Sequence, residues 1–419
     1  MTMDAAGLST QRPGIALAIC TGAALVEGFD NQSMGVAGPR VIAEFGLSAA
    51  QAGVIFSAAT IGLFLGAATG GRLADLWGRK RTLGMSLLIF GICSLATALS
   101  GGPKSLFVAR LITGIGLGGA MPNFISLSSE SAHPERRISA VTLVMAGMPF
   151  GGAIAACVAL GARLGWSWHS IFYAGGVAPI VLAAVLFYAL PDPPRARAAG
   201  LPGMERLDKV STVLFGGDRA MTTLLLWTAF FFTQLILLLM LNWLPSLVRD
   251  LGFTREQASM TSICFNLAGS LGAGLLGQLH AGKKRRRWVA LTYAGMALAL
   301  AGLASVGSSF VLAALACALA GMFIVGAQLV LFALAPLYYP TPIRGTGVGA
   351  AVALGRLGSV VGPLFAGGLL AGGGGSASVL LAIVPFVAVG GAAAFALTWR
   401  KPCDYDASIP RNPGEFHEH

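Results

Sequence analysis

Four ionisable side chains occur inside stretches of sequence that are otherwise apolar. Glu27 and Asp30 lie in GIALAICTGAALVEGFDNQSMGVAG, and Arg110 and Arg356 lie in two later apolar stretches. An ionised group near the centre of a bilayer-spanning helix costs roughly 2.5 to 3.5 kcal/mol on insertion scales, so such groups usually mark a functional site. Two acids and two bases of this kind predict a site that exchanges protons and binds anions.

The positions of the four residues suggest how they pair. Glu27 and Asp30 are three residues apart and therefore share roughly one face of a helix. If the first stretch runs outward and the stretch with Arg110 runs inward, Asp30 and Arg110 fall at a comparable depth, whereas Glu27 and Arg356 lie nearer the middle. Purely structural ion pairs are the alternative interpretation, but buried pairs contribute little net stability, and a functional role is favoured.

Arginine suits a carboxylate ligand because its planar fork of donors matches the two oxygens. Arg110 or Arg356 is therefore predicted to hold the acid group of an organic anion, in place of Asp30 or Glu27. An acid that loses its arginine in this way takes up a proton more readily. We expect Asp30 to carry the proton and Glu27 to tune it. Other candidate substrate-binding residues, which would pack against a ring or bond its hydroxyls, are Phe29, Gln234, Asn242, Trp243 and Gln328.

The composition indicates a membrane protein with many spans. Of 419 residues, 55% are hydrophobic, 11% are charged and 58 are glycine. A helix needs about 20 apolar residues to cross the hydrocarbon core, and stretches of that length recur along the chain. The net charge of +11 comes from short basic clusters between them, which are typical of topology signals and not of a nucleic-acid surface. The scattered cysteines predict neither a disulfide nor a metal site.

Twelve spans are expected, six on each side of one long polar interruption. They lie near 14–37, 51–71, 82–100, 105–128, 138–160, 168–190, 220–246, 257–280, 288–306, 309–335, 345–370 and 376–399. The fold class is therefore an all-α polytopic membrane protein. Its parts are a first six-helix bundle (1–190), a linker (191–219), a second six-helix bundle (220–400) and a tail (401–419).

The distribution of basic residues predicts the orientation. If the N-terminus is cytoplasmic, most Lys and Arg fall in loops on that side, as the positive-inside rule requires. Both termini are then cytoplasmic, and the membrane is the inner, or cytoplasmic, one. The few basic residues left outside are Arg40, Lys104, Arg163, Arg249 and Arg255.

A motif follows the second span. The stretch GGRLADLWGRKR, residues 70–81, combines glycines that allow tight turns, an acid placed in a short loop, and bases that hold the loop at the cytoplasmic face. It resembles the loop signature of the major facilitator superfamily. That resemblance implies two bundles that rock about a central site. It also implies a conformational latch, here formed by Asp75, Arg79, Arg81, Glu130, Arg136 and Arg137.

Two further strings resemble one family within that superfamily. VEGFDNQSMGVAGP resembles the first span of the aromatic acid:proton symporter family, and ARLITGIGLGGAMPNFISLSSESAHPERR resembles its fourth span. The resemblance implies import of an aromatic carboxylate, of the hydroxyphenylpropionate or hydroxybenzoate type, together with protons. The partners are then this acid, protons and the lipid bilayer, with the chain acting as a monomer and without a cofactor. Many members have Asp where this chain has Glu27, one methylene longer.

A proton-driven efflux antiporter for drugs or toxic compounds is the alternative. Efflux members tend to carry Gly-Pro-x-x-Gly-Gly in the fifth span, whereas residues 147–152 read GMPFGG. An enzyme is not expected, because the sequence offers no buried Ser-His or Cys-His set and no metal-spaced cluster.

Overall fold

The computed structural model describes residues 13–132, 137–160, 167–190, 214–216, 219–281, 284–339 and 344–400. Within these ranges the chain is helical and has no strand. The helices in the first half of the chain are α1 (Pro13–Phe45), α2 (Ala49–Trp77), α3 (Arg79–Ala98), α4 (Pro103–Ser131), α5 (Arg137–Leu160) and α6 (His169–Ala189). Those in the second half are α8 (Arg219–Asp250), α9 (Arg255–Ala281), α10 (Arg285–Ala304), α11 (Phe310–Leu334), a short 3-10 helix η3 (Ala335–Tyr338), α12 (Arg344–Ala371), α13 (Ser376–Ala382) and α14 (Val384–Leu397).

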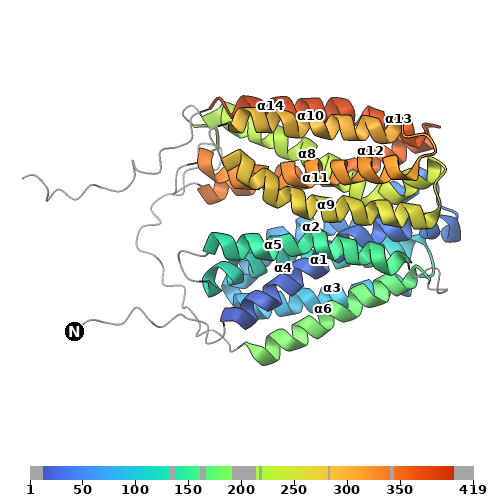
Figure 1. Cartoon of the computed structure of the whole chain (residues 1–419). Coiled ribbons are helices and arrows are strands. Elements are labelled where there is room, and N and C mark those ends of the chain that lie inside the picture. The colour runs from blue at the N-terminus through green and yellow to red at the C-terminus, as the bar shows by residue number, and fades with distance from the viewer. Residues whose placement is uncertain are drawn as a thin grey trace, which may run out of the picture.

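These helices form two bundles, as the sequence predicts (Figure 1). In the first bundle α2 packs on α4, α1 on α5, and α3 on α6; in the second, α8 packs on α12 and α9 on α11. Ten spans among the described residues are long and apolar enough to cross a membrane. The other two are α1, which carries the internal acids, and α9. The all-α fold of twelve spans in two six-helix bundles is thus confirmed, although most of the predicted linker and all of the tail lie outside the described residues.

The last predicted span is two helices rather than one. α13 ends at Ala382 and α14 begins at Val384. Pro385 lies in the first turn of α14, and a proline has no N–H to give to the preceding turn. The chain therefore restarts its helix at this point, and the two pieces together still provide 22 residues of apolar length.

The segment between α2 and α3 corrects one prediction. We expected a loop containing Gly71 and Asp75, but α2 continues to Trp77 and α3 starts at Arg79. The turn consists of Gly78 alone, whose φ of 87° is a conformation that glycine adopts without strain. Asp75 is therefore a residue of the last turns of α2. The motif bends the chain at one glycine, and its acid stands on a helix.

Glycines account for the close packing of the helices. An added Cβ would overlap the backbone carbonyl of Leu111 at Gly62, of Ala59 at Gly114, and of Met148 at Gly28. Small residues let helix backbones approach in this way where no hydrophobic effect drives association between helices in lipid. The high glycine content is thus a packing requirement of the α2–α4 and α1–α5 pairs.

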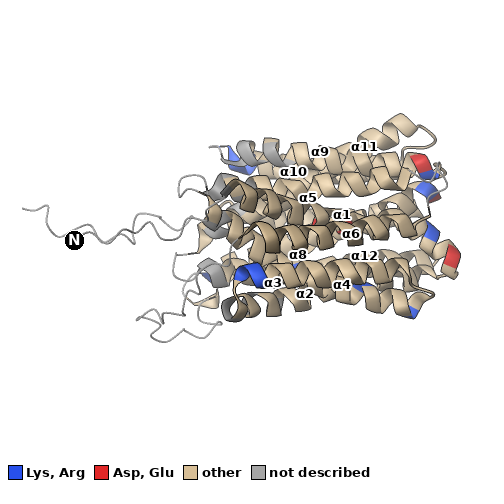
Figure 2. Ribbon diagram, turned by 90° about the horizontal axis from the view of Figure 1, so that it is seen from below, with Lys and Arg blue, Asp and Glu red and all other residues tan. Residues whose placement is uncertain are grey.

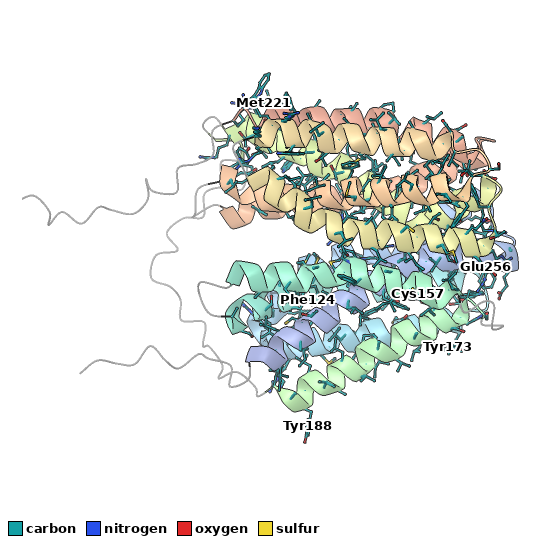
Figure 3. All side chains as sticks on the ribbon, viewed as in Figure 1. Phe124, Cys157, Tyr173, Tyr188, Met221 and Glu256 are labelled. Carbon is teal, nitrogen blue, oxygen red and sulfur yellow. The ribbon has the colours of Figure 1, made fainter. Side chains whose placement is uncertain are left out.

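The outer faces of the bundles are apolar, as lipid contact requires. Leu271, Leu298 and Val311 are each about three-quarters exposed. Tyr188 on α6 and Met221 on α8 point away from the bundles (Figure 3), while most of the ribbon segments coloured for charged residues lie toward the two ends of the molecule (Figure 2). The chain is therefore a multi-pass membrane protein.

The two bundles meet at one end of the molecule. We call the end where α1 begins and α14 ends the proximal end, and the end where α1 stops and α9 starts the distal end. The ribbons of the bundles converge toward the distal end and diverge toward the proximal end (Figure 1). Contacts between bundles join α1 to α8, α2 to α12, and α5 to α9. Gly35 is so close to the Leu241 carbonyl that an added Cβ would overlap it.

Candidate functional site

Asp30 and Arg110 form a buried ion pair between α1 and α4. Arg110 Nη1 donates to Asp30 Oδ1 at 2.6 Å and Arg110 Nη2 donates to Asp30 Oδ2 at 2.9 Å. Both residues are at most 2% exposed, and the guanidinium lies 5.5 Å from the centre of the Phe172 ring. The two-pronged geometry is the strong form of this interaction. The pairing inferred from depth along the helices is therefore present, and it lies wholly within the first bundle.

Glu27 differs from Asp30 in having no such bond. The side chain is 1% exposed, and among the described residues neither carboxylate oxygen accepts a hydrogen bond. The charged groups that act on it electrostatically are Arg356 and Asp30. A buried polar group without a hydrogen bond is costly, and an ionised one more so. Glu27 is thus a buried acid whose charged form has no hydrogen-bond partner among the described residues.

Arg356 comes from the opposite bundle. It is half-buried on α12, and its Nη2 donates to the Met121 sulfur of α4 at 2.9 Å. No carboxylate lies within ion-pair distance of it in the described part of the chain. A thioether is a weak acceptor, so most of the donor fork of Arg356 remains available. Glu27 and Arg356 therefore form an incomplete charge pair across the two bundles.

Two buried amides lie at matching depths in the second bundle. Gln234 on α8 and Gln328 on α11 are each at most 7% exposed. Phe230 and Phe332, each four residues away on the same helix faces, meet at 5.3 Å between ring centres. Since α8 and α11 run in opposite directions, the glutamines lie one turn distal to that contact on both helices. Within the described residues, Gln234 Oε1 and both amide atoms of Gln328 have no partner.

Gln234 lies close to Arg356 along the bundle. Gly355 contacts Phe230, and Gly358 approaches the Phe231 carbonyl so closely that an added Cβ would overlap it. Gln234 is therefore within about one helical turn of Arg356, on the adjacent helix. Burying an amide without a hydrogen bond costs about 1 to 3 kcal/mol, and a polar ligand would offset that cost. Gln234 and Arg356 thus lie on adjacent helices, and Glu27 interacts electrostatically with Arg356 across the two bundles.

The other three predicted substrate residues have partners within the protein. Phe29 lies against Gly175 of α6, inside the first bundle. Asn242 Nδ2 donates to the Leu238 carbonyl of its own helix at 2.8 Å. Trp243 Nε1 donates to the Pro363 carbonyl at 3.1 Å, and its ring meets Phe56 of α2 edge-on at 4.9 Å. Trp243 thus packs the second bundle against the first.

A polar link between the bundles escaped the sequence analysis. Gln32 Nε2 donates to the Leu241 carbonyl at 3.2 Å, and Asn266 Nδ2 donates to Gln32 Oε1 at 2.9 Å. Ser57 Oγ also donates to the Val360 carbonyl of α12 at 3.0 Å. The signal in the first span was a glutamine two residues after Asp30. These bonds close the molecule on the distal side of the site.

The predicted latch is described only in part. Arg79 and Arg81 lie in the first turn of α3, and Lys80 between them donates through Nζ to the Leu190 carbonyl at the end of α6. The position of Arg136 and the side chains of Asp75, Glu130 and Arg137 lie outside the described residues. The latch therefore stays a prediction. Among the residues that the structure does describe, no group of His, Cys, Asp and Glu is arranged to hold a metal ion.

Twelve spans in two bundles, with an incomplete charge pair between them, define a membrane transporter. The sequence model of the Major Facilitator Superfamily matches residues 20–363. The chain belongs to this superfamily, as its loop motif indicated.

Sequence relatives and solved structures agree with this family. The chain is 42% identical to the 3-(3-hydroxy-phenyl)propionate transporter of Escherichia coli K12, an alignment covering 94% of this chain and 97% of the relative. It is 34% identical to the 4-hydroxybenzoate transporter PcaK of Pseudomonas aeruginosa, over 87% and 88% of the two chains. A D-xylose-proton symporter has a TM-score of 0.75 at 19% identity, with 93% of this chain and 98% of that chain covered. The last likeness shows the fold alone.

Proposed function

We propose that the protein is a proton-coupled symporter that imports an aromatic carboxylate by alternating access. The observation that carries the proposal is the incomplete pair of Glu27 and Arg356, a buried acid and a cation from opposite bundles. The named relatives support the substrate class, since the E. coli protein is a transporter of 3-(3-hydroxyphenyl)propionate and the P. aeruginosa protein of 4-hydroxybenzoate. A gallate transporter of Pseudomonas putida, 32% identical, is a further relative of this kind.

The substrate carboxylate is proposed to bind Arg356. Its two oxygens match the guanidinium fork, whose present acceptor is only a thioether. The amides of Gln234 and Gln328 would then bond a ring hydroxyl, which would satisfy atoms that have no partner in this structure. Phe29, Asn242 and Trp243 are not needed for this binding mode. Arg110 is less suited than Arg356, because Asp30 already occupies its fork.

The proton is proposed to travel on Glu27 rather than on Asp30. When the substrate carboxylate neutralises Arg356, the cation no longer favours the charged form of Glu27, and proton uptake follows. Asp30 instead keeps its bond to Arg110 and holds α1 against α4. This assignment moves the proton from Asp30, where the sequence alone suggested it, to Glu27, and gives Asp30 a structural role.

The orientation completes the proposal. The distal end is taken as the outer face and the proximal end as the cytoplasmic face of the inner membrane, with both chain termini inside. On this view the structure is closed to the outside through Gln32, Asn266 and Ser57. We also propose that the chain functions as a monomer, with bundle boundaries at 1–190 and 220–400 joined by the linker 191–219.

A transport assay tests the function. Purified protein is reconstituted into liposomes that are loaded with unlabelled 3-(3-hydroxyphenyl)propionate, and entry of the labelled acid by counterflow is measured. A second assay measures uptake of the labelled acid into empty liposomes under an inward proton gradient. We expect both, with competition by 4-hydroxybenzoate. An efflux antiporter would instead drive the compound against the direction of proton entry. If neither acid is exchanged nor accumulated, the proposed function is wrong.

A further inference from the structure

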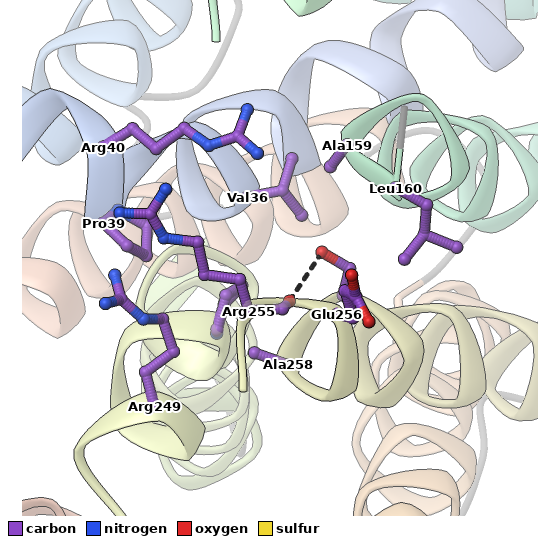
Figure 4. Close-up of a pocket in the computed structure, with 11 residues that line it drawn as sticks. Val36, Pro39, Arg40, Ala159, Leu160, Arg249, Arg255, Glu256 and Ala258 are labelled. Carbon is purple, nitrogen blue, oxygen red and sulfur yellow. Dashed lines mark hydrogen bonds between the residues drawn. The ribbon is translucent and has the colours of Figure 1, made fainter. Parts of the chain in front are cut away.

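Three of the basic residues that the sequence places outside meet in one pocket at the distal end. Arg40 comes from α1, Arg249 from the end of α8 and Arg255 from the start of α9. The pocket is small, with a cavity volume of about 30 Å³, and it is open to solvent. Figure 4 shows the three side chains, with the Arg255 guanidinium between those of Arg40 and Arg249. We call this the distal arginine pocket.

The pocket carries an excess of positive charge. Arg249 and Arg255 both act electrostatically on Arg40, and among the described residues that line the pocket three are arginines and one, Glu256, is an acid. Two other acids at this end have partners elsewhere. Glu44 Oε2 accepts a hydrogen bond from Trp168 Nε1 at 2.6 Å, and Asp250 Oδ2 accepts one from the Ser376 backbone N–H at 3.0 Å.

The lining of the pocket suits a small anion. Apolar side chains line the rest of the wall, among them Val36, Ala159, Leu160 and Pro245. α9 begins at the pocket, and a helix N-terminus favours negative charge. Several guanidinium groups around a cavity are the usual means by which proteins hold carboxylates and phosphates.

The pocket straddles the two bundles. Arg40 belongs to the first bundle, whereas Arg249 and Arg255 belong to the second. Closing the distal end therefore brings like charges together, which by itself opposes closure. An anion between them would offset the repulsion and would bind only where the bundles meet, so that its binding free energy would favour the closed distal end.

We propose that the distal arginine pocket binds a small carboxylate or inorganic oxyanion from the outer solution, and that the bound anion stabilises the conformation with a closed distal end. The site is separate from Glu27 and Arg356; only the statement that the anion comes from the outer solution rests on the proposed function, through the orientation proposed there. It also gives a reason for basic residues on the face where the positive-inside rule disfavours them.

Binding is tested on purified full-length protein carrying Arg356→Gln, which removes the central arginine. Inorganic phosphate and benzoate are titrated separately by calorimetry, with the ionic strength held constant by potassium chloride. We expect saturable binding of at least one probe, weakened at least tenfold by Arg40→Gln and unchanged by Lys104→Gln, a control at an exposed distal position outside the pocket. Binding of phosphate alone identifies an inorganic oxyanion site, and binding of benzoate identifies a carboxylate site.

Conformation is tested with spin labels at the exposed distal positions Ser105 and Ser308, one on each bundle, after replacement of the exposed Cys157. We expect that addition of the anion that binds will shift the distances between the two spin labels toward shorter values and narrow their distribution. Arg40→Gln should abolish this response. Arg249→Gln serves as a second variant should Arg40→Gln fail to fold. Absence of saturable binding, unaltered binding in the folded variant, or an unchanged or longer label distance on binding would each overturn the proposal.

Discussion

Replacing Glu27 with glutamine removes the proposed proton carrier and little else. Glutamine has almost the same shape as glutamic acid, and the Asp30–Arg110 pair keeps both of its hydrogen bonds. Because neither oxygen of Glu27 accepts a hydrogen bond from the described residues, no existing bond is lost. The variant should therefore fold, bind substrate and exchange it, but without coupling to protons.

The expected size of the effect follows from the number of protons that move. Asp30 is held in a two-pronged ion pair, so the proposal assigns the single transported proton to Glu27, the other buried acid among the described residues. One proton moving down a gradient of one pH unit supplies about 1.4 kcal/mol, which sustains about tenfold accumulation of substrate. The wild type should approach that ratio, and Glu27→Gln should equilibrate the substrate without accumulating it. One proton with one monoanion moves no net charge, so the wild type should not respond to voltage.

The assay is uptake of labelled 3-(3-hydroxyphenyl)propionate into proteoliposomes, with a pH gradient and a membrane potential imposed separately. Counterflow without any gradient serves as the control that Glu27→Gln still binds and moves substrate. Glu27→Asp, which keeps an acid one methylene shorter, should retain accumulation. Wild-type accumulation by Glu27→Gln would refute the assignment of the proton to Glu27. A response of about 2.3 kcal/mol per 100 mV in the wild type would show that a second proton moves.

Three further substitutions test the rest of the site. Arg356→Lys keeps the charge but loses the planar fork of donors. The substrate Kd should therefore rise at least tenfold, while the melting temperature changes little. An unchanged Kd in a binding titration would exclude Arg356 as the carboxylate ligand. Asp30→Asn leaves Arg110 as a buried cation without its acid. Thermal unfolding should therefore show a loss of stability of about 3 to 5 kcal/mol, and the transport assay should show that substrate is no longer accumulated. Wild-type stability of this variant would contradict the structural role of Asp30. Gly35→Ala adds a methyl group where the Leu241 carbonyl lies, whereas Gly14→Ala adds one where nothing described lies within 4 Å. Gly35→Ala should increase the labelling of cysteines placed at the distal interface, and Gly14→Ala should not. Equal labelling of the two variants would show that Gly35 does not control closure of the distal end.

The sequence was sufficient to predict the fold and the Asp30–Arg110 ion pair, because both depend on the position of residues along a helix. Apolar length and a single polar interruption gave the twelve spans. Counting residues from the ends of two antiparallel spans placed Asp30 beside Arg110, and the structure has that bond. The predicted extent of the α2–α3 turn was wrong because charged residues in the last turns of α2 were assigned to a loop. A helix can continue past the hydrocarbon core and carry such residues into the polar interface of the membrane.

Contacts between the bundles could not be predicted in the same way. Gln32 and Asn266 are 234 residues apart and bond to each other, and neither carries a charge that would single it out in an apolar stretch. The three distal arginines stood out in the sequence as exceptions to the positive-inside rule. Their convergence on one pocket, however, depends on how the two bundles dock. The unpaired state of Glu27 likewise depends on the docked position of Arg356.

The placement of the two charge pairs decides which of them can couple protons to transport. Asp30 and Arg110 both belong to the first bundle, so a rocking motion carries them together and leaves their bond unchanged. Glu27 and Arg356 belong to different bundles, so the same motion changes the distance between them and, with it, the electrostatic cost of a charge on Glu27. On the proposed mechanism, the second pair therefore senses which side of the membrane is open. A substrate carboxylate on Arg356 would act on that same distance-dependent interaction, so that binding, protonation and rocking of the bundles would be linked at one place.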